Sequence, residues 1–101
     1  MTDYNFLGML EEIIKKQKNA DPKESYTARL WQEGLNKITQ KFGEESVEVT
    51  IAALKEDDQR FISEVSDLLY HLLVMVEKKG VKFSDIMAEL KQRNAKYHGT
   101  D

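Results

Sequence analysis

The chain has 101 residues, which is enough for one domain with a modest core. Apolar residues make up 41% and charged residues 33%, and the scarcity of turn residues, with five Gly and one Pro, favours a few long helices over many short strands. A net charge of −3 argues against a nucleic-acid-binding protein, and the lack of cysteine excludes disulfides, thiolate zinc sites and cysteine nucleophiles.

The N-terminal segment predicts a first helix, from about Tyr4 to Lys18, rather than a targeting signal. Apolar residues recur there at helical spacing, namely Phe6, Leu7, Leu10, Ile13 and Ile14. The segment lacks the basic region and apolar run of a signal peptide, and the longest apolar stretch of the chain is too short to cross a bilayer. We expect a cytoplasmic protein with no membrane contact.

The second and third helices are predicted on either side of a glycine. KNADPKES, which holds the only proline, predicts a linker, and Ser25 is a candidate N-cap for the helix that follows. Gly34 either ends that helix or kinks it. Apolar spacings of three and four then predict a helix from about Leu35 to Leu54, in which the interior Gly43 costs roughly 1 kcal/mol against alanine.

A fourth, long helix is predicted from about Gln59 to Lys79. Asp57 or Asp58 is its expected N-cap, and Gly80 stops it. Its broad apolar stripe consists of Phe61, Val65, Leu68, Leu69, Leu72, Leu73 and Val76. A last helix is expected to be capped by Ser84, with three residues facing inward, namely Ile86, Leu90 and Tyr97.

These elements predict an all-α bundle of four to five helices, forming a single domain over residues 1–101. Val74 and Met75 lie off the main stripe of the long helix, so this helix is apolar around most of its circumference. Such a helix requires partners on more than one side, and a second subunit is a natural source of that cover in a short chain. We therefore expect a homodimer, and a well-wrapped monomer is the alternative.

Two acidic pairs are predicted to meet across the third and fourth helices. Glu45 and Glu48 lie beside the apolar stripe of one helix, and Glu64 and Asp67 lie beside that of the other. Residues three apart are neighbours on a helix surface, about 5–6 Å between Cβ atoms. A short turn joins the helices into an antiparallel hairpin, and both pairs lie at matching distances from it, so four carboxylates should face each other.

Four like charges beside a core repel each other, and desolvation adds to the cost. A hard divalent cation removes this problem, and oxygen ligands favour Mg²⁺, with Mn²⁺ as an alternative, over zinc or copper. Mg²⁺ sites are commonly completed by substrate phosphates. A solvated acidic face remains a second interpretation. A di-iron bundle needs Glu-x-x-His, whereas His71 lies four residues after Asp67, which argues against iron.

The acidic pattern resembles that of the all-α nucleoside triphosphate pyrophosphohydrolases, the MazG-like superfamily. GEESVEV and EVSDLLYHLLV contain its pattern, EExxE followed by ExxD. Within that group the stretch from about Ser25 to Arg93 is most similar to the phosphoribosyl-ATP pyrophosphatase family of histidine biosynthesis, through SYTARLWQEGLNKITQKFGEE, IAAL and DLLYHLL.

The resemblance implies Mg²⁺-dependent conversion of 1-(5-phosphoribosyl)-ATP to 1-(5-phosphoribosyl)-AMP and pyrophosphate, by a dimer. It places the metal ligands at Glu45, Glu48, Glu64 and Asp67. Glu44 matches the first acid of the motif and is expected beside the ligands, and His71 carries no ligand role and is expected to be packed and hydrogen-bonded nearby. Some family members are fused to a cyclohydrolase, and we expect no such domain in this chain.

Several residues are candidates for the chemistry around the metal. Either Glu45 or Glu48 can accept the proton of the attacking water. Lys41 lies one turn before Glu45 and either contacts a phosphate or forms an ion pair with Glu44 or Glu45. The other substrate-binding candidates are Ser25, Tyr26, Thr27 and Arg93, although N-capping is the simpler role for Ser25.

Three functional hypotheses follow from the sequence. The first is phosphoribosyl-ATP pyrophosphatase. The second is a housecleaning pyrophosphatase that uses the same metal site on ordinary or damaged nucleotides. The third is a non-enzymatic helical dimerisation module whose acidic cluster is merely solvated.

Overall fold

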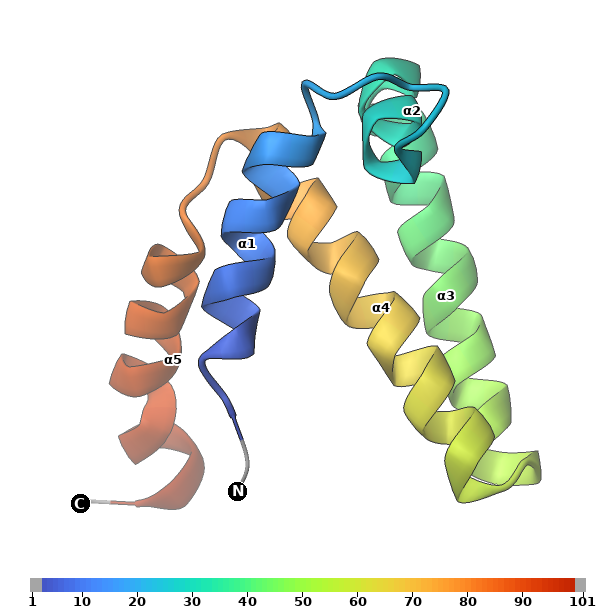
Figure 1. The fold of residues 1–101 in the computed structure, drawn as a ribbon. Helices are drawn as coiled ribbons and strands as arrows, with labels where there is room; N and C mark the ends of the chain where they lie inside the picture. Colours follow the sequence, from blue (N-terminus) through green and yellow to red (C-terminus); the bar gives the residue numbers. More distant parts are fainter. Residues whose placement is uncertain (1–2, 100–101) are drawn as a thin grey trace.

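A computed structural model describes residues 3–99, which form five α-helices and contain no strand. The helices are α1 (Phe6–Gln17), α2 (Tyr26–Glu33), α3 (Leu35–Lys55), α4 (Asp58–Lys79) and α5 (Phe83–His98) (Figure 1). The predicted all-α bundle is confirmed. Within the described residues, no helix combines the length and the apolar character needed to span a membrane.

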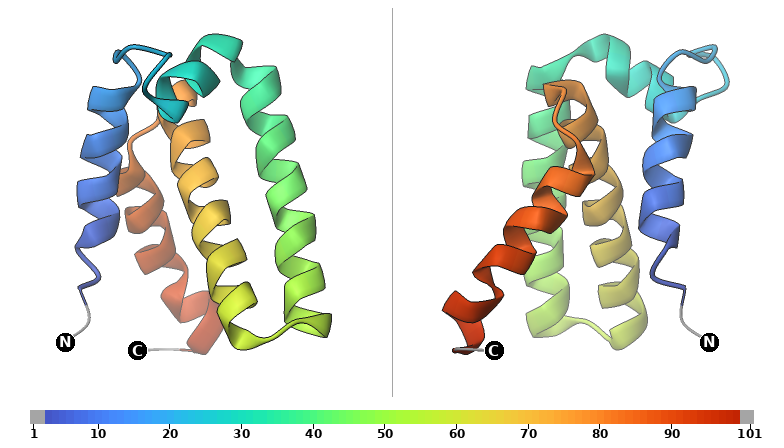
Figure 2. Two further views of the ribbon diagram at one scale, coloured as in Figure 1. Left: turned by 45° about the vertical axis from the view of Figure 1, so that its right-hand side comes forward. Right: turned by 90° about the vertical axis from the view of Figure 1, so that its left-hand side faces the viewer.

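The long helices α3 and α4 form an antiparallel hairpin that is the frame of the molecule (Figures 1 and 2). The side chain of Asp57 caps α4 by accepting from the backbone N–H of Arg60 at 2.9 Å. Gly80 ends the helix with a φ of 76°, in the left-handed region that glycine adopts without strain. The hairpin predicted from the sequence, with its start and stop signals, is therefore correct.

Helices α1 and α2 close one end of this hairpin. Figure 2 shows the short α2 crossing the end at which α3 begins and α4 ends, with α1 alongside α4. Ser25 caps α2, since its hydroxyl accepts from the backbone N–H of Ala28 at 3.1 Å. Gly34 has a φ of 94° and separates α2 from α3, so it ends the helix rather than kinking it. Enclosed here is the small core of Ile14, Leu30, Ile38, Leu73 and Val74.

The other end of the hairpin, next to the α3–α4 turn, carries apolar side chains on its surface. These exposed residues are Val47, Ile51, Leu54, Phe61 and Ile62. The predicted stripe of α4 is therefore partly wrong for the single chain: Phe61 and Leu69 are exposed, whereas Val74, which the periodicity placed off the stripe, is fully buried. The reason is that α1 and α2 cover α4 only in its C-terminal half, on the side of Val74 (Figure 1).

Helix α5 packs only loosely against α4 and lies at the left of the view in Figure 1. None of its residues is buried, and Leu90 and Tyr97, which were expected to face inward, are exposed. Ser84 was wrongly predicted as the cap, because α5 begins one residue earlier, at Phe83. A side chain from another helix takes that part instead: the carboxylate of Glu11 on α1 accepts from the backbone N–H of Phe83 at 3.2 Å.

Candidate metal centre

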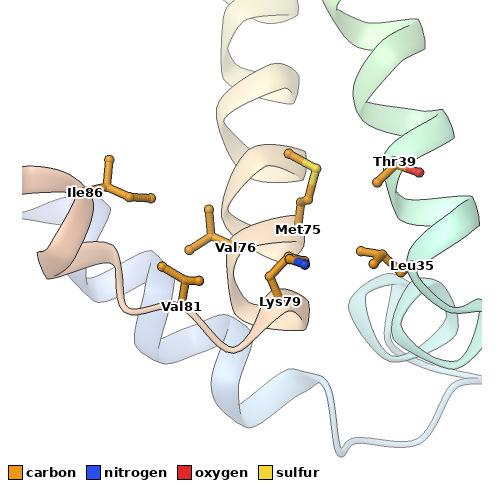
Figure 3. Close-up of a pocket in the computed structure, with 7 residues that line it drawn as sticks. All are labelled: Leu35, Thr39, Met75, Val76, Lys79, Val81 and Ile86. Atoms are coloured by element: carbon orange, nitrogen blue, oxygen red, sulfur yellow. The ribbon is translucent and has the colours of Figure 1, made fainter. Parts of the chain in front are cut away.

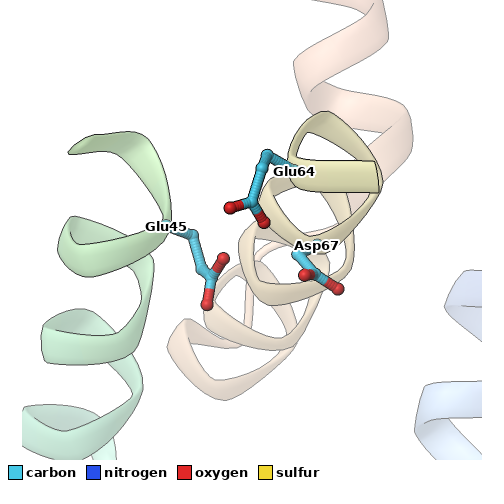
Figure 4. A group of neighbouring side chains, drawn as sticks. All are labelled: Glu45, Glu64 and Asp67. Atoms are coloured by element: carbon cyan, nitrogen blue, oxygen red, sulfur yellow. The ribbon is translucent and has the colours of Figure 1, made fainter. Parts of the chain in front are cut away.

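Three carboxylates converge between α3 and α4. Glu45 extends from α3 towards Glu64 and Asp67, which lie one turn apart on α4 (Figure 4). One ligand oxygen from each side chain lies within 4.8 Å of those of the other two. The antiparallel register brings the residues to the same height, as the sequence spacing predicted.

The members of this trio differ in exposure. Glu64 is only 5% exposed, Glu45 is half-buried and Asp67 is exposed. The fourth predicted ligand, Glu48, lies outside the trio and is also exposed, but its carboxyl reaches Glu64. Hydrogen bonding between these two carboxyls raises the pKa of Glu64, and burial and the negative charge of Glu48 act in the same direction. Full ionisation of these neighbouring carboxyls is therefore unfavourable without a counter-ion.

The donor set fits a hard divalent cation. All the donors are carboxylate oxygens, the ligands that Mg²⁺, Mn²⁺ and Ca²⁺ prefer. Oxygens that bind one Mg²⁺ at about 2.1 Å lie at most roughly 4.2 Å apart, so side chains whose oxygens are within 4.8 Å need only small rotations to bind it. The exposure of Asp67 leaves one side of the cluster open to solvent, where a substrate can approach.

Arg60, which lies one turn before Glu64 on α4, was not predicted from the sequence. Its Nη2 atom is 3.4 Å from Oε2 of Glu64, and its Nε atom is 3.7 Å from Oε1 of Glu56. The positive charge of Arg60 lowers the pKa of Glu64, against the larger effects that raise it. The spacing of four residues between Arg60 and Glu64 was a usable signal, since such pairs meet on a helix surface.

His71 borders the cluster but both of its ring nitrogens are occupied. Its Nδ1 atom donates to the backbone carbonyl of Asp67 at 2.7 Å, and its Nε2 atom lies 3.0 Å from the hydroxyl of Tyr26. Because a carbonyl can only accept, Nδ1 carries a proton, and with its one N–H placed there the imidazole can accept from Tyr26 at Nε2. The ring is 5% exposed and has no nitrogen available for a metal.

Tyr26 and Thr27 form hydrogen bonds to α4, whereas the hydroxyl of Ser25 is used within its own helix. Tyr26 bonds to His71, Thr27 forms a hydrogen bond with the hydroxyl of Tyr70, and Ser25 caps its own helix. The pKa of Tyr26 is raised chiefly by burial, with Lys41 lowering it and Glu45 raising it. Tyr26 is linked through His71 to the backbone of Asp67, so its phenol lies near the acidic cluster, whereas the hydroxyls of Ser25 and Thr27 are used within the fold.

Two predicted basic contacts are not brought into the cluster. Lys41 lies 3.7 Å from Oε1 of Glu44 and forms the ion pair that was its alternative role. Glu44 is itself outside the trio; a hydrogen bond from Gln40 and the charge of Lys41 lower its pKa. Arg93 pairs with Glu89 at 2.7 Å within α5 and, among the described residues, forms no ion pair with the trio.

Two further features of the surface are the open position at Gly43 and an apolar hollow near the closed end of the hairpin. A Cβ atom added at Gly43 would have no other residue's atom within 4 Å, so the α3 surface next to Glu44 is open. An apolar hollow of about 360 Å³ lies towards the closed end of the hairpin, between α3, α4 and the start of α5 (Figure 3). No carboxylate lines that hollow, and it is separate from the trio.

Comparison with known proteins gives a match over most of the chain. Residues 7–94 match the family model described as phosphoribosyl-ATP pyrophosphohydrolase. The chain is 42% identical over 95 residues to the histidine biosynthesis bifunctional protein HisIE of Yersinia pestis, covering 94% of this chain and 47% of that protein. The proteins of the same name from Campylobacter jejuni and Vibrio cholerae are each 45% identical, over 92 and 89 residues, covering 91% and 88% of this chain and 44% and 42% of theirs. The chain thus spans slightly less than half the length of these relatives.

Proposed function

The chain belongs to the phosphoribosyl-ATP pyrophosphohydrolase family, and from that premise we propose that it is a cytoplasmic enzyme of histidine biosynthesis. Its reaction is the hydrolysis of 1-(5-phosphoribosyl)-ATP to 1-(5-phosphoribosyl)-AMP and pyrophosphate, the second step of the pathway. The observation that carries this proposal is the family match over residues 7–94, which includes the acidic trio of Glu45, Glu64 and Asp67.

Mg²⁺ is the proposed cofactor, with Mn²⁺ as an alternative, held by Glu45, Glu64 and Asp67 and by Glu48 after a change of rotamer. The support is the hard-oxygen donor set and its spacing. When bound, such a cation polarises phosphoryl oxygens, orients the triphosphate and lowers the pKa of a bound water.

The protein's own carboxylates are proposed to manage the proton of the attacking water. As the water oxygen bonds to phosphorus, the α–β phosphoanhydride bond breaks, pyrophosphate leaves and one water proton passes to a carboxylate. Either Glu45 or Glu48 is the proposed acceptor: Glu45 belongs to the acidic trio, and Glu48 is exposed beside Glu64.

The nucleotide substrate also requires positive and hydrogen-bonding partners. Lys41 is the proposed phosphate contact from α3, since its pairing with Glu44 is long and its side chain is partly exposed. Tyr26 can accept a hydrogen bond from the substrate while it donates to His71. Ser25 and Thr27 are proposed to position Tyr26 rather than to contact the substrate, because their hydroxyls already have partners.

A homodimer is proposed as the working form. The apolar residues exposed at the open end of the hairpin, including Leu54 at 77% and Val47 at 58%, support this proposal. Arg93 is proposed to contact the substrate only in the dimer, where α5 of one copy can lie next to the acidic cluster of the other. Analytical ultracentrifugation should find a dimer, and a compact monomer at micromolar concentration would remove the proposal.

The activity is tested by incubating the purified protein with 1-(5-phosphoribosyl)-ATP and Mg²⁺ and identifying the products by chromatography. We expect pyrophosphate and 1-(5-phosphoribosyl)-AMP in equal amounts, and at least a hundredfold lower rate for Asp67→Asn, since a ligand is lost. Direct release of orthophosphate would contradict the proposed bond cleavage. Faster cleavage of dCTP or dUTP would favour a housecleaning pyrophosphatase instead.

A further inference from the structure

Four polar residues form a row along one side of α4 that includes part of the acidic cluster. The residues at the two ends of this row differ in burial and in hydrogen bonding. Arg60, Glu64, Asp67 and His71 follow one another at spacings of three and four, which places them along one side of a helix. His71, at one end, is 5% exposed and has hydrogen bonds of 3.0 Å and 2.7 Å at its two ring nitrogens. Arg60, at the other end, is next to the α3–α4 turn and is largely in solvent.

The contacts of Arg60 are loose. Its distances to Glu64 and Glu56 are 3.4 Å and 3.7 Å, whereas charge-assisted hydrogen bonds are commonly about 2.7–2.9 Å. The Arg60 side chain is 56% exposed, so the guanidinium can change rotamer without disturbing packed residues. Glu64, by contrast, is nearly buried, and its carboxylate cannot move away from the cluster as freely.

The local charge balance makes this loose contact important. Among residues 3–99, Arg60 is the only basic side chain that forms an ion pair with Glu64, its neighbours in the trio or Glu48. Lys41 pairs with Glu44 instead. A divalent cation bound to Glu64 would place a second positive charge beside Arg60. The pairing with Glu64 then loses most of its electrostatic benefit, and the guanidinium is free to contact an anion.

We propose that Arg60 is an exchangeable counter-ion, which neutralises Glu64 without the metal and contacts the phosphates of the substrate once the metal is bound. This proposal rests on the proposed function, since it assumes a divalent cation and a polyphosphate at the cluster. The planar guanidinium suits both roles, because it can bind carboxylate and phosphate oxygens through two parallel N–H groups.

Titration calorimetry with Mg²⁺ alone tests the first half of the proposal. We expect Arg60→Gln to bind Mg²⁺ about three- to tenfold more tightly than the unchanged protein, because a competing positive charge is removed from Glu64, and we expect the gain to shrink at high salt. Lys55→Gln is the matched control, since it removes an equal charge near the same turn from a side chain that makes no ion pair among the described residues. It should change the affinity less than twofold.

Binding of inorganic pyrophosphate at saturating Mg²⁺ tests the second half. We expect about threefold or greater weakening in Arg60→Gln and little change in Lys55→Gln. Arg60→Lys retains the charge without the planar fork, so it should bind Mg²⁺ like the unchanged protein and pyrophosphate with intermediate affinity. Melting curves of all three variants should match that of the unchanged protein, because both altered positions are exposed.

The outcomes separate this proposal from the proposed function. Unchanged or weaker Mg²⁺ binding in Arg60→Gln, or unchanged pyrophosphate binding, would overturn the exchange even if the enzyme hydrolyses phosphoribosyl-ATP. If both affinities shift as expected but phosphoribosyl-ATP is not cleaved, the role of Arg60 stands and the substrate assignment fails. Absence of Mg²⁺ binding in the unchanged protein would overturn both.

Discussion

The two ends of the α3–α4 hairpin are built on different principles. At the closed end, α1 and α2 cover the helices and enclose an apolar core in which Ile38 and Val74 are fully buried. At the open end, Ile51, Leu54 and Ile62 lie on the surface although the same two helices run through both regions. The apolar faces of α3 and α4 are thus covered within the chain at the closed end and exposed at the open end.

The acidic cluster lies at the boundary between these ends. On the closed side, His71 and Tyr26 tie α4 to α2 through buried hydrogen bonds, so the backbone at Asp67 is well fixed. On the open side, Arg60 is exposed and loosely paired. The acidic cluster thus has a hydrogen-bonded frame on one side and an exposed, loosely paired side chain on the other.

The largest expected contrast comes from one substitution made at both ends of α3. Ile38→Ala should lower the free energy of unfolding by about 2–5 kcal/mol, because it removes a fully buried side chain from the core. Ile51→Ala makes the same change at a site that is 48% exposed, and should cost well under 1 kcal/mol in the isolated chain. Urea unfolding at low protein concentration measures both.

The protein concentration adds a second test of the open end. If a second copy covers Ile51, the cost of Ile51→Ala should increase with protein concentration, whereas the cost of Ile38→Ala should depend on it much less. Equal costs for the two variants at low concentration would show that the closed and open ends are not distinct.

A smaller effect is expected at the bond that ties α2 to the cluster. Tyr26→Phe removes the hydroxyl that donates to His71 and leaves a buried ring nitrogen without a partner, so the free energy of unfolding should fall by about 1–3 kcal/mol. Tyr4→Phe is the control, because its side chain is 83% exposed, and it should change little. Equal stability of the two variants in thermal unfolding would show that the hydrogen bond from Tyr26 to His71 does not stabilise the fold.

The smallest effect is expected from the pH dependence of the metal-free protein. The pKa of Glu64 is raised in the folded state, so the folded chain binds more protons than the unfolded chain at pH values between the two pKa values. The contribution of Glu64 to stability should therefore fall as the pH rises from about 4.5, its ordinary value, through the folded value. At pH values above the pKa of Glu64 in the folded state, the free energy of unfolding stays lowered by a constant amount.

The comparison of wild-type protein with Glu64→Gln isolates this effect. The glutamine variant cannot ionise, so its stability relative to wild type should increase with pH over that window and then level off. Added Mg²⁺ should remove the difference in slope by neutralising the carboxylate. The stability difference is measured by urea unfolding from pH 4 to pH 8. A difference that does not change with pH would show that the pKa of Glu64 is not raised in the folded state.

Much of this fold could be predicted from the sequence because the determining signals are local. The caps at Ser25 and Asp57 and the stops at Gly34 and Gly80 lie next to the helix ends that they set. The convergence of Glu45 with Glu64 and Asp67 followed from helix geometry and a short turn. These inferences needed only spacing and hydrogen-bonding chemistry.

What could not be predicted depends on which faces are covered in three dimensions. Periodicity identifies an apolar face on α4 but cannot show that α1 and α2 cover only the C-terminal half, which is why Val74 is buried and Phe61 is exposed. The cap of α5 comes from Glu11, a residue distant in sequence, so Ser84 was chosen wrongly. Arg60 lies four residues before Glu64, a spacing that predicts a contact on the helix surface, but the basic residues considered from the sequence were Lys41 and Arg93.

The central claim is that Glu45, Glu64 and Asp67 form a divalent-cation site at the boundary of the hairpin, and urea unfolding with and without Mg²⁺ tests it most directly. At a free Mg²⁺ concentration of 100 times the dissociation constant, the free energy of unfolding should rise by about 2.7 kcal/mol. Asp67→Asn should lose most of that gain. An equal response to Mg²⁺ in wild-type and Asp67→Asn proteins, or no response in either, would contradict the claim.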